Sequence, residues 1–141
     1  MDFHVAEYEP FHSDLAADVV AELTESSDVH GDMLRVLAGF LEEEDLLDAE
    51  IVEEALAVAC LVGARVRGEA EHEEAREWLA AARVTVTPEL KGLAHAVFER
   101  GTRVGDNALY EVWSDAGVLD EWLAGLAGYR AAVAGLRCRP S

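Results

Sequence analysis

Apolar side chains recur at the three- and four-residue spacing of an α-helix along most of the chain. Ser13 and Asp14 supply capping oxygens for the first such segment, and the polar residues 26–28 end it and can cap the next. The second segment carries a broad apolar face, formed by Val29, Met33, Val36, Leu37, Phe40 and Leu41. The pattern therefore predicts two amphipathic helices before the acidic stretch that begins at Glu42.

A third segment differs from its neighbours because its middle, from Ala55 to Ala64, is apolar on all sides. A helix of this kind is buried, so we place a helix near residues 48–67 in the centre of the fold. Gly68 follows it and is a typical helix end. We interpret Cys60, inside this segment, as a small buried apolar residue, because a thiolate would be poorly stabilised there.

The second half of the chain continues with helical patterns. An acidic helix carries Trp78 on its apolar face. The next segment, residues 84–87 (VTVT), alternates like a strand, but four residues with no obvious partner strand predict a connection. Residues 87–89 (Thr-Pro-Glu) combine a hydroxyl cap, a proline in the first turn and an acid at the positive end of a helix. Asp106 and Asn107 then cap a short helix that Gly117 ends.

The last predicted helix carries an apolar stripe at alternating steps of four and three residues: Trp122, Leu126, Tyr129, Val133 and Leu136. Such a stripe suits packing along another helix, and a homodimer built on it stays open. Glycines at 125, 128 and 135 each cost about 1 kcal/mol relative to alanine, so we expect a neighbouring helix to approach closely there. The whole pattern predicts an all-α fold, a bundle of six or seven helices forming one domain over residues 1–141.

The composition fits one such domain, but the charge is unusual. The chain has 141 residues, of which 51% are hydrophobic, and a formal net charge of −18. Such a surface repels nucleic acid and anionic membranes, so we expect neither as a partner. No signal peptide is recognisable, and the apolar run at 55–64 is shorter than the roughly 20 residues that span a bilayer. These features predict a cytoplasmic protein.

The negative charge is concentrated in the first part of the chain. Residues 1–54 hold 17 Asp and Glu but only Arg35 as a basic residue, whereas residues 55–141 hold 12 acidic and 10 basic residues. The densest stretch contains Glu42, Glu43, Glu44, Asp45, Asp48, Glu50, Glu53 and Glu54. Two interpretations stay open for these carboxylates: a solvated, screened surface, or a surface that binds a basic partner.

Helix dipoles distinguish the two ends of this stretch. Asp45, Asp48 and Glu50 lie in or before the first turn of the predicted third helix, where the dipole favours negative charge. Glu42, Glu43 and Glu44 lie at the end of the predicted second helix, where the dipole opposes them by about 0.3–1 kcal/mol each. The local structure therefore accounts for only part of the acidic stretch.

Motifs of catalysis and metal binding are mostly missing. The chain has no G-x-S-x-G elbow, Walker loop, G-x-G-x-x-G or H-E-x-x-H. Glu69 and His72 match half of a di-iron signature, which needs a second Glu-x-x-His and two further glutamates. The acidic stretch lacks the glycine of a calcium loop, and consecutive carboxylates on a helix point in different directions. We therefore expect no catalytic residues, no metal and no cofactor; the alternative is a metal-dependent enzyme or metal carrier that uses Glu69 and His72.

Three stretches of the sequence are similar to a known family. They are FHSDLAAD at residues 11–18, TPELKGLAHAVFERG at 87–101 and NALYEVWSDAGVLDEWLAGLAGYRAAV at 107–133. They resemble the uncharacterised bacterial family of the domain of unknown function forty-two fifty-nine. The first ten residues, MDFHVAEYEP, depart from that family's Gly-Trp-Gly-containing start, because they hold neither Trp nor Gly. The resemblance implies a shared helical fold and carries no activity.

The charge pattern leads to an expectation about function. We expect a non-enzymatic protein-interaction domain whose acidic residues bind a basic protein, as immunity proteins that neutralise basic toxins do. Complementary charge accelerates such encounters and sets their specificity. The sequence leaves an inhibitor and a mimic of nucleic acid equally open, because mimicry depends on how carboxylates are spaced over the surface.

Overall fold

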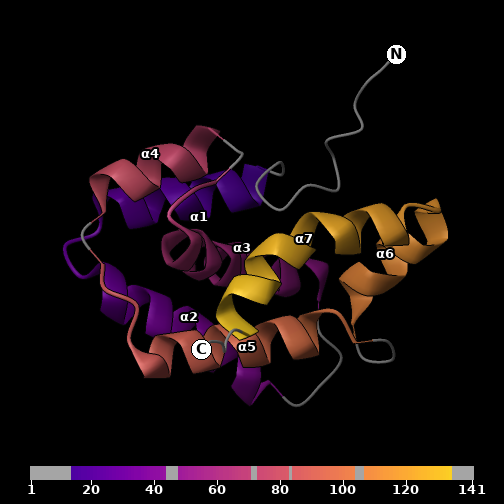
Figure 1. Ribbon diagram of the computed structural model, residues 1–141. Coiled ribbons are helices and arrows are strands. Elements are labelled where there is room, and N and C mark those ends of the chain that lie inside the picture. The colour runs from indigo at the N-terminus through magenta and orange to yellow at the C-terminus, as the bar shows by residue number, and fades with distance from the viewer. Residues whose placement is uncertain (1–13, 44–47, 71–72, 83, 104–106, 135–141) are drawn as a thin grey trace, which may run out of the picture.

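The computed structural model describes residues 14–43, 48–70, 73–82, 84–103 and 107–134, which form seven helices (Figure 1). The helices are α1 (Asp14–Glu25), α2 (Val29–Glu42), α3 (Ala49–Arg67), α4 (Glu73–Ala81), α5 (Pro88–Gly101), α6 (Ala108–Ala116) and α7 (Leu119–Ala134). Within these ranges no residue is in a strand, and residues 84–87 are an extended connection. The predicted all-α class and the number of helices are confirmed.

Helix α3 lies at the centre of the molecule, as its all-apolar middle predicted. Every residue from Ala55 to Ala64 is buried, and all six other helices contact α3 (Figure 1). The helix has Asp48 as its N-cap residue and ends at Gly68, whose φ of 81° is in the left-handed region that favours glycine. A helix without a polar face is stable in water only when neighbours cover it on every side.

Short-range side-chain hydrogen bonds fix where several helices begin. The side-chain oxygens of Asp28, Thr87 and Asn107 each accept a hydrogen bond from the backbone N–H three residues later, at 3.0–3.1 Å. Each cap satisfies a donor that the first turn leaves without a partner, which stabilises a helix by about 1 kcal/mol. All three caps were predicted, and they set the starts of α2, α5 and α6.

The apolar stripe of α7 is buried inside the single chain. Its described members, Trp122, Leu126, Tyr129 and Val133, are all buried, and α7 packs on α3 and α5. The fifth member, Leu136, lies outside the described residues. The stripe is therefore occupied by helices of the same chain rather than left exposed for a second copy.

A close approach of α7 to α3 is present, but the glycine that permits it is on the other helix. A Cβ atom added to Gly63 of α3 would lie 2.6 Å from the carbonyl oxygen of Tyr129 and 2.9 Å from its Cα. At Gly128 of α7, an added Cβ would instead lie 3.0 Å from Nη1 of Arg67. At Gly128 a side chain of the neighbouring helix α3, rather than its backbone, makes the close approach, and Gly135 lies outside the described residues.

Among the described residues, none of the helices combines the length and the hydrophobicity needed to cross a bilayer.

Candidate functional site

The acidic stretch joins α2 to α3, and four of its six described carboxylates are exposed to solvent. Because α2 ends and α3 begins within it, two helices contribute to one acidic surface. In the structure Glu42, Glu43, Asp48 and Glu50 are exposed, Glu53 and Glu54 are partly buried, and Glu44 and Asp45 lie outside the described residues. We refer to the six described residues as the acidic surface.

Several arginines pair with carboxylates outside the acidic surface: Arg35 with Asp32, Arg67 with Glu69 at 3.5 Å, and Arg130 with Glu99 at 2.6 Å. Among the described residues, no such pair forms with Glu42, Glu43, Asp48, Glu50 or Glu54. The Arg130–Glu99 pair joins α7 to α5, away from the acidic surface. The hydrogen bond and the positive charge of Arg130 lower the pKa of the Glu99 carboxyl.

Arg100 of α5 stabilises the end of α2 beside the acidic surface. Its Nη1 donates hydrogen bonds to the carbonyl oxygens of Phe40 and Leu41 at 3.0 and 3.2 Å, and its guanidinium lies 5.5 Å from the centre of the Phe40 ring. The last turn of α2 has no basic residue of its own. Arg100 therefore supplies the positive charge that the dipole of α2 favours at this end, and so offsets the unfavourable position of Glu42 and Glu43.

Arg65 plays the same part at the end of α4. It donates to the carbonyl oxygens of Leu79 and Ala82 at 3.2 and 2.5 Å and lies over the ring of Trp78 at 5.2 Å. The last turn of α4 also lacks a basic residue. Two helices thus end on an arginine from another helix, and each guanidinium interacts favourably with the dipole of the helix that it ends.

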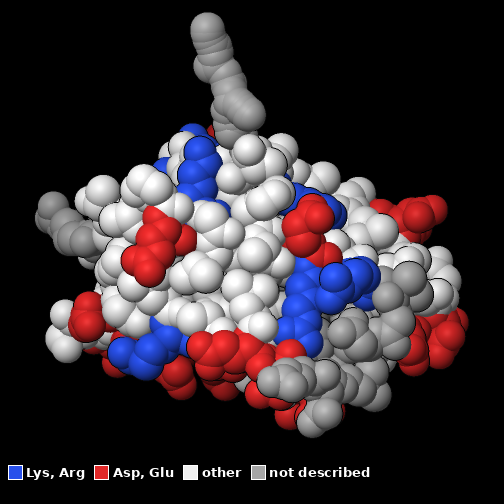
Figure 2. All heavy atoms as spheres, turned by 90° about the horizontal axis from the view of Figure 1, so that it is seen from below, with Lys and Arg blue, Asp and Glu red and all other residues white. Residues whose placement is uncertain are grey.

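The acidic residues of the first third of the chain do not all share one face. Exposed acids also lie on α1, at Asp18, Glu22 and Glu25, and α1 packs against α4 at the top of Figure 1, whereas α2 lies at the bottom. Figure 2 shows carboxylates clustered along the lower edge and the right side of one face, with basic side chains between some of them. The acidic surface is therefore a smaller region than the charge asymmetry of the sequence alone suggested.

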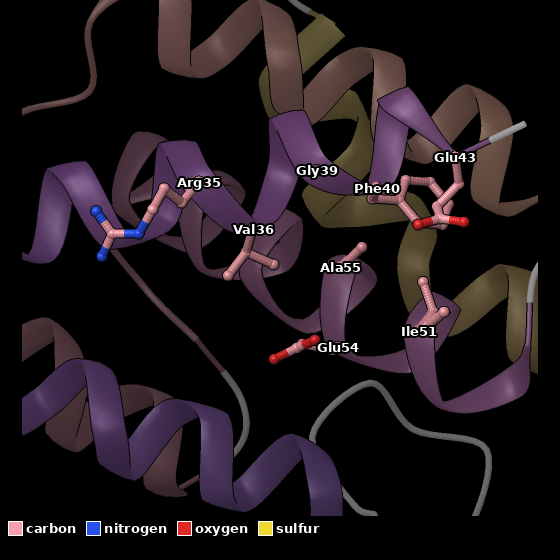
Figure 3. Close-up of a pocket in the computed structure, with 8 residues that line it drawn as sticks. All are labelled: Arg35, Val36, Gly39, Phe40, Glu43, Ile51, Glu54 and Ala55. Atoms are coloured by element: carbon pink, nitrogen blue, oxygen red, sulfur yellow. The ribbon is translucent and has the colours of Figure 1, made fainter.

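A groove of about 270 Å³ lies between α2 and α3 next to the acidic surface (Figure 3). Val36, Phe40, Ile51 and Ala55 give it an apolar lining, and Glu43 and Glu54 place a carboxylate on each helix beside it. Arg35 and Gly39 complete the lining. Val36 and Ile51 are only partly buried, although Val36 belongs to the apolar face predicted for α2.

The residues considered for metal chemistry are not brought together. Glu69 is exposed and pairs with Arg67, and His72 lies outside the described residues. Among the described residues, no three His, Cys, Asp or Glu side chains are grouped so that they could hold a metal ion. Burial raises the pKa of the Cys60 thiol well above its ordinary value, so this thiol stays protonated at neutral pH.

The sequence reasoning missed both Arg100 and the groove. Arg100 is 60 residues from Phe40 in the chain, so no local pattern relates them. The groove lies between α2 and α3, and its apolar residues have the same spacing as core residues. The available signal was weak: Gly39, a glycine inside a helical pattern, lies on the groove.

Comparison with protein families gives one match. The family described as Domain of unknown function (DUF4259), the family forty-two fifty-nine named above, matches residues 6–125. Neither a curated protein nor a solved structure matches the chain.

Proposed function

We propose that this chain, which belongs to the DUF4259 family, is a non-enzymatic binding protein that offers its acidic surface to a basic protein partner. One observation carries the proposal: exposed carboxylates at the α2–α3 connection have no ion-pair partner among the described residues. A group of unpaired carboxylates produces a negative electrostatic potential, which accelerates the approach of a basic protein and repels acidic ones. A basic toxin is one kind of protein that such an acidic surface would bind.

The chain's own arginines support this assignment. Arg65 and Arg100 are held by backbone carbonyls, and Arg130 is held by Thr102 and Glu99. A basic partner therefore does not have to displace these internal contacts before it reaches the acidic surface. Binding to such a surface gains mainly in association rate, because exposed ion pairs contribute only about 0–1 kcal/mol each.

A charge-neutralising variant tests the proposal. In it Glu42→Gln, Asp48→Asn and Glu50→Gln remove three exposed charges from the acidic surface. The control variant, Glu111→Gln with Asp115→Asn and Asp120→Asn, removes three exposed charges from α6 and the start of α7. Both variants change the net charge equally, so a difference between them reports the position of the charge.

The measurement has two steps. Proteins retained from a cell extract by the immobilised chain are identified, and the association rate constant of each purified partner is then measured at roughly 50 and 200 mM salt. We expect the partner to have a basic surface. At the lower salt, its association rate constant should fall about tenfold in the variant with Glu42→Gln, Asp48→Asn and Glu50→Gln, and much less in the control variant. An acidic partner, or equal rates in the two variants, would contradict the proposal.

A further inference from the structure

We propose that the groove between α2 and α3 binds one arginine side chain of the basic partner. The inference rests on the proposed function, because it names the group on the partner that is held beside the acidic surface. The groove, at about 270 Å³, is below the roughly 300–1,000 Å³ of typical small-molecule sites, so its size suits a single side chain.

The lining of the groove requires a guest with an apolar portion. Val36 and Ile51 remain partly exposed on its two helices, and the buried residues Phe40 and Ala55 line it between them. Removing such apolar surface from water is favourable by about 25 cal/mol per Å². The methylene stem of an arginine can cover this surface while its charged head stays at the edge.

The carboxylates of Glu43 and Glu54 select the head group of the guest. Glu43 follows the end of α2, and Glu54 comes from α3, one turn after Ile51. Among the described residues, neither carboxylate has an ion-pair partner. A guanidinium carries five N–H donors in a planar fork that matches the geometry of a carboxylate, whereas a lysine ammonium is a more strongly hydrated point charge. The groove therefore favours arginine over lysine.

Gly39 leaves one part of the wall of the groove open. It lies inside α2, where glycine costs about 1 kcal/mol relative to alanine, yet an added Cβ would meet no atom within 4 Å. No contact inside the molecule therefore requires a glycine at this position. Its missing side chain leaves the wall of the groove open to an incoming group.

Arg35, the basic residue of the lining, does not close the groove to a cation. Its guanidinium pairs with the carboxylate of Asp32, one turn earlier on α2. Figure 3 shows Arg35 at the far end of the groove, with its guanidinium turned away from Glu43 and Ile51. Arg35 is therefore already paired with a carboxylate of its own helix, and its guanidinium points away from Glu43.

Three model peptides and two matched variants test the assignment. Each blocked, alanine-based helical peptide carries two lysines, and its central position is arginine, lysine or citrulline, the last being a neutral analogue of arginine. Gly39→Leu fills the groove, whereas Gly92→Leu adds the same side chain at an exposed glycine inside α5 whose Cβ would also meet nothing within 4 Å. Thermal unfolding followed by circular dichroism confirms that both variants fold.

Dissociation constants are measured by fluorescence anisotropy, and the contact site is located from amide NMR shifts of the labelled protein. The wild-type chain is expected to bind the arginine peptide about tenfold more tightly than either of the others. Gly39→Leu abolishes this advantage and Gly92→Leu keeps it, with the largest shifts at the residues lining the groove. Equal binding of the three peptides by the wild-type chain, or a full arginine advantage in Gly39→Leu, overturns the assignment.

The same peptides separate failure of the groove from failure of the proposed function. The variant with Glu42→Gln, Asp48→Asn and Glu50→Gln leaves the lining of the groove intact. Suppose that it weakens binding of all three peptides, and that Gly39→Leu still binds the arginine peptide more tightly than the other two. The proposed role of the acidic surface is then supported, and the assignment of the groove is refuted. If it leaves all three peptides unaffected, the proposed function falls as well.

Discussion

At the scale of single residues, Gly63 sets the distance between the two most extensively packed helices. It lies in the buried middle of α3, and the backbone of Tyr129 on α7 occupies the place where a side chain would start. Backbone atoms in a packed interior cannot rotate away as the end of a flexible side chain can. The identity of residue 63 therefore determines how closely α7 covers the central helix.

Substituting Gly63 by alanine is predicted to destabilise the protein. The added Cβ would lie 2.6 Å from the Tyr129 carbonyl oxygen, so α7 must move away from α3. Overpacking of this kind costs about 1–3 kcal/mol, which urea denaturation measures as a lower midpoint. Gly39→Ala is the matched control: its Cβ meets nothing within 4 Å, and it should stabilise the protein by about 0.5–1 kcal/mol. An unchanged urea midpoint in Gly63→Ala would show that α7 can move away from α3 without loss of stability.

At the scale of helices, two C-terminal ends depend on residues from elsewhere in the chain. Arg100 of α5 holds the end of α2, and Arg65 of α3 holds the end of α4. In each case the guanidinium also stacks over an aromatic ring of the helix that it caps, Phe40 or Trp78. Each arginine therefore joins two helices by hydrogen bonds and by an aromatic contact, which fixes the position of one helix end against another.

Replacing Arg100 by methionine is predicted to weaken the attachment of α2 to α5. Methionine keeps an apolar stem but removes the donors to the Phe40 and Leu41 carbonyl oxygens and the positive charge at the end of α2. Hydrogen bonds that involve a charged group contribute about 1.5–3 kcal/mol, so we expect a loss of roughly 2 kcal/mol in urea denaturation. Arg35→Met, which removes an exposed i,i+3 ion pair with Asp32, should change stability by no more than about 0.5 kcal/mol. Equal losses in the two variants would refute this account.

At the scale of the whole molecule, the net charge of −18 opposes the compact state. Folding brings the carboxylates of α1, the acidic surface, α6 and α7 onto one small body, where they repel one another. Arg100 places one positive charge beside Glu42 and Glu43 at the end of α2, but the exposed carboxylates of the acidic surface have no ion-pair partner among the described residues. A basic partner would relieve it on binding, which is consistent with the proposed function.

Neutral salt is therefore predicted to stabilise the isolated chain. Raising sodium chloride from about 20 to about 500 mM shortens the distance over which the carboxylates repel one another. We expect the thermal midpoint at pH 7 to rise by roughly 3–5 °C, the shift that about 1 kcal/mol produces in a domain of this size. The rise should be smaller in the variant with Glu42→Gln, Asp48→Asn and Glu50→Gln. A midpoint that falls with salt would mean that attractive ion pairs dominate.

The sequence alone determined the helices and the place of the central one. Caps such as Thr87 and Asn107 act within three residues, and the left-handed glycines Gly68 and Gly117 act on the turn that they end, so these signals are local. The all-apolar middle of α3 likewise predicted its burial without any knowledge of its neighbours. The same information named the carboxylates of the acidic stretch, of which the structure describes six around the end of α2 and the start of α3.

Only the tertiary structure decided which groups meet across the molecule. It placed Arg100 on the end of α2, put Gly63 rather than Gly128 at the backbone of α7, and covered the α7 stripe within the chain. It also left Val36 and Ile51 partly exposed in a groove, although their spacing is that of core residues. The physical reason is that such contacts join residues distant in the chain, and their partners depend on how helices pack rather than on local pattern.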